Sequence, residues 1–302
     1  MRSFASRIVT LVAVPTALVG ACKSTPTSNT DAGSPVPSFV KPRASSPPLA
    51  SNIPVPAASV DKAVNPDKLP PYSGPTGAVE GVVKIQGDPN PEVKLELTSA
   101  CAGARSTYDH LFREGPGRTL ADAMVAVTEY KGFLPAKEPS VKVKVNACAY
   151  DRLTYVVTYG QRLDVLSEDP TNSYVPFLTG FDSTARLVLT PKTEGGVKLY
   201  PLDIGRYVLV DEMKRPWMKA DVFVLKYPTH AVTGLDGRFR IEGIPVGDVR
   251  VSAFLPVIDA TEGKKVKVED GKTATVDFTL TYKRPTAAPS ASAPAGKAPA
   301  AK

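Results

Sequence analysis

The chain has 302 residues, which is enough for one large or two small domains with a buried core. Its formal net charge is +7, but residues 77–284 contain 28 Lys and Arg against 27 Asp and Glu, so the excess positive charge lies in the flanking segments. A nucleic-acid-binding protein concentrates its basic residues on the folded body, as a patch or stripe. We therefore expect no nucleic-acid partner.

Residues 1–21 have the pattern of an export signal. Two arginines precede the apolar stretch 8–19, which is too short to span a bilayer as a mature helix. The sequence Leu18-Val19-Gly20-Ala21-Cys22 resembles the lipobox of bacterial lipoproteins. This resemblance implies cleavage before Cys22, lipidation of that cysteine and a membrane anchor. The alternative is an ordinary secretory signal in which Cys22 has no role.

Lys23 stands where an aspartate would favour retention in the inner membrane, so the resemblance to a lipobox implies the outer membrane of the cell envelope.

The segments that flank the folded body are rich in small residues and proline. Residues 22–76 have too few large apolar side chains to offset the entropy of ordering, which predicts a disordered stalk. Residues 284–302 predict a second disordered tail, rich in Ala and Pro.

Two cysteines remain once Cys22 is set aside, namely Cys101 and Cys148. An even number of cysteines in an oxidising compartment favours a disulfide between them. Two buried free thiols are the alternative.

The body of the chain predicts an all-β protein. Short runs with alternating apolar residues, many of them Val or aromatic, are separated by Gly, Pro and Asp, and none has helical periodicity. Such spacing is typical of β-sandwiches and barrels. We expect strands at residues 78–85, 93–97, 123–130, 141–147, 153–159, 162–167, 185–190, 206–212, 220–227, 237–243, 248–254, 264–270 and 273–282.

Residues 229–283 contain a recurring pattern of turns and strands. Asp236-Gly237 precedes the strand-like RFRIEG, Ile244-Pro245-Val246-Gly247 precedes DVRVSAF, and Asp270-Gly271 precedes the last run. This sequence pattern resembles that of the carboxypeptidase regulatory-like (transthyretin-like) β-sandwich. The resemblance implies that residues 77–120 supply opening strands to this module. It implies no peptidase activity, and the chain has no zinc-peptidase motif.

Residues 121–228 resemble plastocyanin-like (cupredoxin) domains. The similarity rests on Leu120-Ala121-Asp122-Ala123, on Cys148-Ala149-Tyr150, and on Pro216-Trp217-Met218 near the end. Both modules are then expected to be Greek-key β-sandwiches. In this alignment the four copper ligands of the family fall on Ser173, Glu212, Arg215 and Met218.

These four residues do not form a copper ligand set. A blue-copper site needs two imidazoles and a thiolate, with a weak axial methionine, and only Met218 remains. Arginine is a cation without an acceptor atom, so we expect no metal and no cofactor. We predict instead that Glu212 and Arg215 form an ion pair across the lost site. Trp217 and Met218 are predicted to pack in the core.

Other catalytic chemistry has little support. The two histidines, His110 and His230, are predicted to lie in exposed loops, and the chain has no G-x-S-x-G motif. Acidic pairs such as Glu168-Asp169 fall at predicted turns, where we expect them to be solvated. The sequence therefore predicts a non-enzymatic, lipid-anchored protein of the cell envelope that binds a glycan or an envelope protein. The alternatives are copper-dependent electron transfer and an unrecognised envelope hydrolase.

Overall fold

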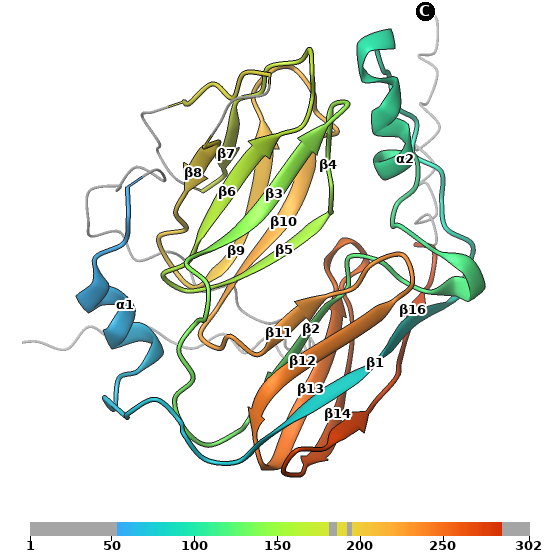
Figure 1. Cartoon of the computed structure of the whole chain (residues 1–302). Helices are drawn as coiled ribbons and strands as arrows, with labels where there is room; N and C mark the ends of the chain where they lie inside the picture. Colours follow the sequence, from blue (N-terminus) through green and yellow to red (C-terminus); the bar gives the residue numbers. More distant parts are fainter. Residues whose placement is uncertain (1–52, 181–185, 192–194, 286–302) are drawn as a thin grey trace, which may run out of the picture. The chain divides into compact units, whose positions relative to one another are not determined.

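The structure is a computed structural model that describes residues 53–180, 186–191 and 195–285 (Figure 1). The described residues form four four-stranded sheets. Their buried apolar side chains fall into two clusters, and each cluster belongs to two of the sheets. We call the two resulting pairs of sheets sandwich 1 and sandwich 2. The predicted all-β fold class is confirmed.

Sandwich 1 is built from the middle of the chain. One sheet has the order β4-β3-β6-β8 and the other β5-β10-β9-β7. Because β5 and β6 are neighbours in the chain but lie in different sheets, the chain crosses from one sheet to the other between them. The strands are β3 (Ser140–Asn146), β4 (Ala149–Tyr150), β5 (Thr154–Thr158), β6 (Arg162–Ser167), β7 (Pro176–Leu178), β8 (Val197–Leu199), β9 (Gly205–Asp211) and β10 (Lys219–Leu225).

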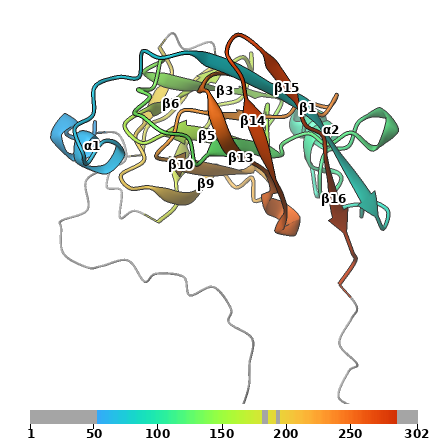
Figure 2. The same cartoon turned by 90° about the horizontal axis from the view of Figure 1, so that it is seen from below.

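Sandwich 2 combines the C-terminal strands with two strands from earlier in the chain. In one sheet β1 pairs antiparallel with β12 (Figure 1) and parallel with β15 and β16 (Figure 2). The other sheet has the order β11-β2-β13-β14. The strands are β1 (Thr76–Gly87), β2 (Met124–Thr128), β11 (His230–Val232), β12 (Arg238–Pro245), β13 (Gly247–Leu255), β14 (Ala260–Val268), β15 (Thr273–Thr275) and β16 (Phe278–Tyr282).

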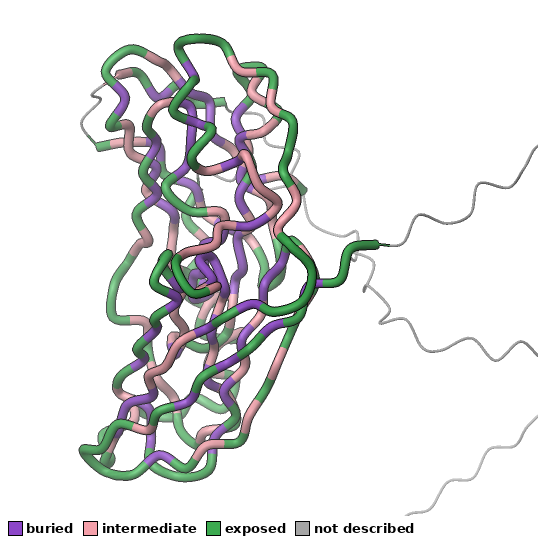
Figure 3. The backbone as a smooth tube through the Cα atoms, turned by 90° about the vertical axis from the view of Figure 1, so that its right-hand side faces the viewer, coloured by how far each residue is buried: buried purple, intermediate pink, exposed green. Residues whose placement is uncertain are grey.

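The alternating sequence pattern explains these strands. Successive side chains of a strand point to opposite faces, so every second residue enters the core. In β12, Phe239 and Ile241 are buried while Arg238 and Arg240 are exposed. Figure 3 shows buried and exposed positions succeeding one another along both sandwiches. Residues 77–120 were predicted to supply opening strands to the C-terminal module; of these residues, β1 forms a strand there, and 93–97 does not.

A segment of short helical turns leads from β1 to β2. It contains the 3-10 turns η1 (Ser99–Ala104) and η2 (Pro116–Arg118) and the one-turn helix α2 (Arg105–Tyr108). A further 3-10 turn, η3 (Pro256–Ile258), follows β13. A disulfide joins Cys101 in η1 to Cys148 in the turn between β3 and β4, as predicted. The alternative of two free thiols is therefore wrong.

The segment before β1 differs from the prediction of a stalk. Residues 57–64 form helix α1 (Ala57–Val64), and Val60, Ala63 and Val64 pack against the core of sandwich 1. These apolar residues recur at three- and four-residue spacing, which places them on one helix face. The prediction of disorder was therefore wrong for residues 57–64. Residues 1–52 and 286–302, including Cys22 and most of the predicted tail, lie outside the described residues.

Three strand predictions also need correction. Residues 93–97 form no strand. Of the predicted strand 185–190, the structure describes residues 186–190, and among these only Leu189 makes a bridge, to Tyr174. Strand β2 was predicted to belong to the module at 121–228, but it pairs with β11 and β13 in sandwich 2. Val125 and Val127 of β2 are fully buried in the core of sandwich 2, which explains this pairing.

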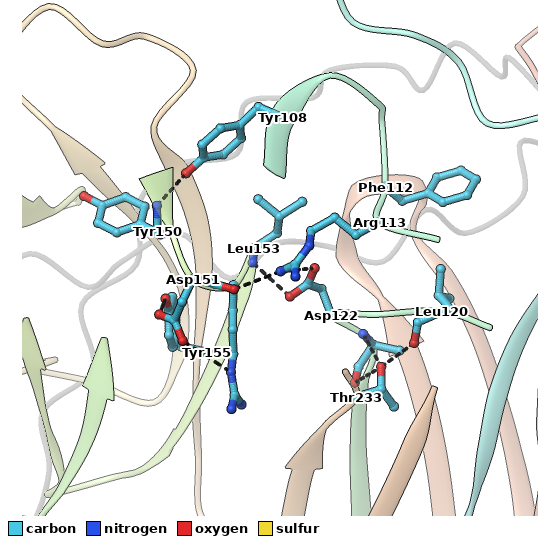
Figure 4. Close-up of polar contacts among 12 residues, drawn as sticks. Tyr108, Phe112, Arg113, Leu120, Asp122, Tyr150, Asp151, Leu153, Tyr155 and Thr233 are labelled. Carbon is cyan, nitrogen blue, oxygen red and sulfur yellow. Dashed lines mark hydrogen bonds and ion pairs between the residues drawn. The ribbon is translucent and has the colours of Figure 1, made fainter. Parts of the chain in front are cut away.

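A buried polar cluster links the two sandwiches (Figure 4). Asp122, just before β2, accepts a hydrogen bond of 2.9 Å from the Leu153 backbone N–H, beside β5. Arg113 donates to the Asp122 carboxylate at 3.3 Å and to the Asp151 carbonyl at 2.9 Å. Burial raises the pKa of Asp122, and the Arg113 guanidinium opposes that shift. On the other side of Asp122, the Thr233 hydroxyl donates to the Leu120 carbonyl at 2.6 Å.

Among the described residues, none of the helices has both the length and the apolar character that a membrane span requires.

Candidate functional site

The loop between β9 and β10 contains most of the residues that align with copper ligands. It runs from Asp211, the last residue of β9, to Lys219, the first of β10. Met218 is fully buried in the core of sandwich 1, and Trp217 packs against that core, as predicted. The fourth aligned position, Ser173, lies just before β7 and approaches the loop through its backbone.

The predicted ion pair between Glu212 and Arg215 is absent, and this prediction was wrong. Arg215 instead donates to the Asp211 carboxylate at 2.7 Å and to the Ser173 carbonyl at 3.0 Å. The Asp211 side chain is fully buried and that of Arg215 is 11% exposed. Glu212 pairs with Arg186 on the surface, at 3.1 Å.

The alternation of β9 explains this exchange of partners. Leu209 and Asp211 point into sandwich 1, so the next residue, Glu212, points towards solvent. The second oxygen of Asp211 accepts the Val175 N–H at 2.7 Å. The Arg215 guanidinium also lies 4.6 Å from the centre of the Tyr174 ring, within the range of a cation–π contact. The position of the aligned histidine is therefore filled by an arginine whose side chain is 11% exposed and paired with Asp211.

A second carboxylate beside this loop is also buried, contrary to the prediction for Glu168-Asp169. Asp169 accepts hydrogen bonds from the Tyr174 hydroxyl and from the N–H groups of Thr171 and Asn172. Burial alone would raise its pKa, but these hydrogen bonds outweigh the burial and lower it. The Tyr174 oxygen in turn accepts the Cys148 N–H at 3.0 Å. Glu168 does remain exposed, beside Lys144.

The donor set does not fit copper. Where two imidazoles and a thiolate are needed, the structure places the Ser173 carbonyl, the paired Arg215 and the exposed Glu212. Of the aligned ligand set, only the buried Met218 thioether remains. No group of three His, Cys, Asp or Glu side chains suited to a metal ion occurs within residues 53–180, 186–191 and 195–285.

A cleft of about 870 Å³ opens beside Trp217, and sequence reasoning did not find it. Val208 of β9, Ala220 of β10 and residues 93–96 are part of its lining. Most of its lining is apolar or aromatic, as is usual for sites that bind small ligands. The lining residues are Val93, Lys94, Leu95, Glu96, Tyr108, His110, Leu111, Leu153, Val208, Lys214, Pro216, Trp217, Lys219, Ala220, Asp221 and Val257.

The aromatic residues of the cleft are held by hydrogen bonds within the protein. The Trp217 indole N–H donates to the Cys148 carbonyl at 3.2 Å. The Tyr108 hydroxyl accepts the Tyr150 N–H at 3.2 Å (Figure 4). Cys148 is also bonded to Cys101, which precedes Tyr108 by seven residues. The disulfide therefore joins the segment that carries Tyr108 to the turn whose carbonyl accepts the Trp217 indole N–H.

The histidines offer little support for hydrolysis. His110 was predicted in an exposed loop; it is half-buried, with 43% of its side chain exposed, and its Nδ1 lies 2.7 Å from the Asp109 carboxylate. The nearby Ser106 hydroxyl donates to the Gly103 carbonyl, at 2.9 Å. His230 was predicted in an exposed loop, but it lies in β11, 3.3 Å from the Thr158 hydroxyl. Burial lowers its pKa to about 4, so His230 is neutral at pH 7.

Residues 207–281 match the family model of the carboxypeptidase regulatory-like domain. The match begins in β9 and thus includes β9 and β10 of sandwich 1 as well as β11–β15 and most of β16. It covers less than half of the chain. The sequence resemblance at residues 229–283 is confirmed by this match.

Solved structures similar to this chain include copper proteins of the cupredoxin type. Amicyanin from Paracoccus versutus is 19% identical, over 33% of this chain and 96% of its own, with a TM-score of 0.25. A reduced amicyanin mutant is 18% identical, over 30% and 85% of the two chains, also with a TM-score of 0.25. A copper-containing nitrite reductase from Thermus scotoductus is 18% identical, over 32% and 24%, with a TM-score of 0.23. No curated protein matches the chain.

Proposed function

We propose that the protein is a non-enzymatic, lipid-anchored binding module of the bacterial cell envelope. The observation that carries this proposal is the apolar cleft beside Trp217. The cleft volume is within the range of about 300–1,000 Å³ that is common for ligand sites. The export signal and Cys22 support an envelope location, and the sequence offers a glycan or an envelope protein as partner.

Electron transfer is the competing function, and the Asp211–Arg215 pair argues against it. A permanent cation at the position of an imidazole ligand repels a copper ion. Titration of the purified protein with copper, followed by metal analysis and the absorption band of a copper–thiolate bond, separates the two functions. We expect neither stoichiometric copper nor the band, and finding both would establish the electron-transfer alternative.

The binding function can be tested with a neutral apolar dye. N-Phenyl-1-naphthylamine fluoresces in apolar surroundings, and Trp217, the single tryptophan of the chain, reports the cleft directly. We expect saturable binding of one dye molecule, with quenching of Trp217. Val93→Asp, which changes the cleft lining, should abolish binding. Val246→Asp is the matched control, because Val93 and Val246 are 38% and 37% exposed and Val246 does not line the cleft.

Two results would overturn the proposal. Dye binding that is absent, or unaffected by Val93→Asp, would remove the cleft as a binding site. Turnover of chromogenic ester or glycoside substrates that is lost in His110→Ala would establish a hydrolase instead.

The predicted lipid anchor has its own test: a Cys22→Ala variant should no longer incorporate labelled palmitate or sediment with the outer membrane.

A further inference from the structure

The apolar and aromatic residues that make up most of the cleft lining offer few free hydrogen-bonding groups. Leu95, Leu153 and Val208 contribute aliphatic surface. The indole N–H of Trp217 and the hydroxyl oxygen of Tyr108 are already bonded to backbone groups of the protein. A ligand with many hydroxyl groups would lose its bonds to water here without replacing them. The body of the ligand is therefore expected to be apolar rather than a sugar.

The charged side chains of the cleft are not balanced. Lys94, Lys214 and Lys219 line it, and none forms an ion pair with a described residue. Of the two acidic residues, Asp221 is neutralised by Arg206 at 2.8 Å, which leaves Glu96 against three lysines. The cleft thus has a net positive charge from side chains that no protein partner neutralises.

We propose that the cleft binds an amphiphilic organic anion, with an apolar chain against Leu95 and Trp217 and a carboxylate or phosphate near the lysines. This inference rests on the proposed binding function, and it replaces the glycan or envelope protein expected from the sequence with an amphiphile as the ligand of the cleft. A free fatty acid and the acyl chain of an anionic phospholipid share this chemistry. Complementary charge selects between ligands of equal apolar surface, because the lysines favour an anion and repel a cation.

The test compares three amphiphiles that have the same twelve-carbon chain, below their micelle concentrations. Dodecanoate, dodecanol and dodecyltrimethylammonium are titrated against the dye complex of the full chain, with Trp217 fluorescence as the readout. We expect dodecanoate to bind at least tenfold more tightly than the cation. Decanoate, two CH₂ groups shorter, should bind more weakly, by about fourfold for each buried CH₂ group. Dioctanoyl phosphatidylglycerol in place of dodecanoate distinguishes a phospholipid ligand from a free acid.

Reversing the charge of Lys214 and Lys219, two of the three lysines that line the cleft, separates this inference from the binding function itself. Lys214→Glu combined with Lys219→Glu should weaken dodecanoate binding at least tenfold and leave dodecanol binding within twofold. Lys198→Glu, an exposed lysine of β8 in the opposite sheet, is the matched control and should change neither.

Each outcome decides one of the two proposals. If the three amphiphiles bind equally, or if the double variant Lys214→Glu, Lys219→Glu binds dodecanoate as the wild type does, the anion inference is wrong while the cleft remains a binding site. If neither dye nor amphiphile binds, both proposals fall. Preference for dodecyltrimethylammonium would overturn the anion inference outright.

Discussion

The Asp211–Arg215 pair shows how one residue position determines the chemistry of the loop. Both side chains are at most 11% exposed, and each has further hydrogen bonds, to Val175 and to Ser173. A buried pair of this kind gives little net stability, but removal of one partner leaves an uncompensated charge in the core. The stability of the loop therefore depends on the presence of both Asp211 and Arg215.

We predict that Arg215→Met lowers the free energy of unfolding by about 3–5 kcal/mol, because Asp211 then stays buried without its partner. Glu212→Gln is the control, and we expect a change within about 0.5 kcal/mol, because Glu212 is 53% exposed and its pair with Arg186 is superficial. Urea denaturation of both variants measures the difference. Equal effects of the two substitutions would contradict the pairing that we describe.

His230 gives the stability a defined pH dependence. Its pKa is lowered from 6.5 to about 4 by burial, so the folded state stays neutral where the unfolded state takes up a proton. Acidification from pH 6.5 to 4 therefore favours unfolding, and the contribution of His230 over this range is about 3 kcal/mol. We predict that His230→Gln, which keeps a polar group for Thr158, removes this part of the pH dependence.

Urea denaturation at several pH values tests this prediction by the difference between wild type and His230→Gln. The difference removes the contribution of the carboxylates, which titrate in both proteins. It should change steadily between pH 6.5 and 4 and stay constant above pH 7. A difference that is constant throughout would show that His230 titrates normally in the folded protein.

At the scale of elements, local alternation predicted the strands well where a strand buries one face. Residues 162–167 were predicted with the bounds of β6, and the predicted ranges of β3 and β5 differ from the structure by one residue at each end. The alternation at 93–97 failed because Leu95 and Leu97 pack against sandwich 1 without a neighbouring strand. Helix α1 was missed because proline-rich flanks outweighed its three spaced apolar residues.

The candidate site was less predictable than the fold. The Pro216-Trp217-Met218 frame was visible in the sequence, whereas the partner of Arg215 depended on which of two adjacent acids points inward. The cleft could not be predicted, because residues 93–96, 208 and 217 are brought together only by tertiary structure. Net charge and composition could predict neither the partner of Arg215 nor the cleft, because each depends on the positions of a few side chains.

The disulfide lies next to residues that line the cleft, because Cys148 accepts the Trp217 indole N–H through its carbonyl. It closes a loop with a sequence separation of 47 between η1 and the β3–β4 turn. In that turn Ala147 and Cys148 have φ values of 47° and 60°, which suit a two-residue hairpin but are unfavourable for residues with a side chain. The covalent bond thus acts on a turn whose conformation is not the intrinsic preference of its residues.

We predict that the double variant Cys101→Ser, Cys148→Ser is less stable by about 4 kcal/mol, the chain-entropy value for a loop of this length. The same variant should bind the neutral dye more weakly, because Cys148 also holds the Trp217 indole through its carbonyl. Denaturation and dye titration measure the two effects. Dithiothreitol should reproduce both in the wild type and add nothing to the variant; unchanged dye binding would separate the disulfide from the cleft.

At the scale of the whole molecule, few contacts join the two sandwiches. Besides the Arg113–Asp122 cluster, these include Thr158 with His230 and the aromatic pair Phe223 and Phe254, whose ring centres are 5.7 Å apart. Asp122 is the most demanding of them, because it is a buried carboxylate at a φ of 62°. Asn tolerates this conformation more readily than Ala does.

We predict that Asp122→Ala uncouples the unfolding of the two sandwiches. It removes the acceptor for the Leu153 N–H and for Arg113, at about 1–3 kcal/mol for each buried group left unpaired, and places Ala in a left-handed conformation. Trp217 fluorescence reports sandwich 1, and circular dichroism reports both sandwiches. In the wild type the two urea transitions should coincide, and in Asp122→Ala they should separate.

The control variant Asp122→Asn keeps an acceptor for Leu153 and should stay closer to the wild type. If both probes shift together in Asp122→Ala, the remaining contacts suffice to couple the sandwiches and the cluster contributes only local stability.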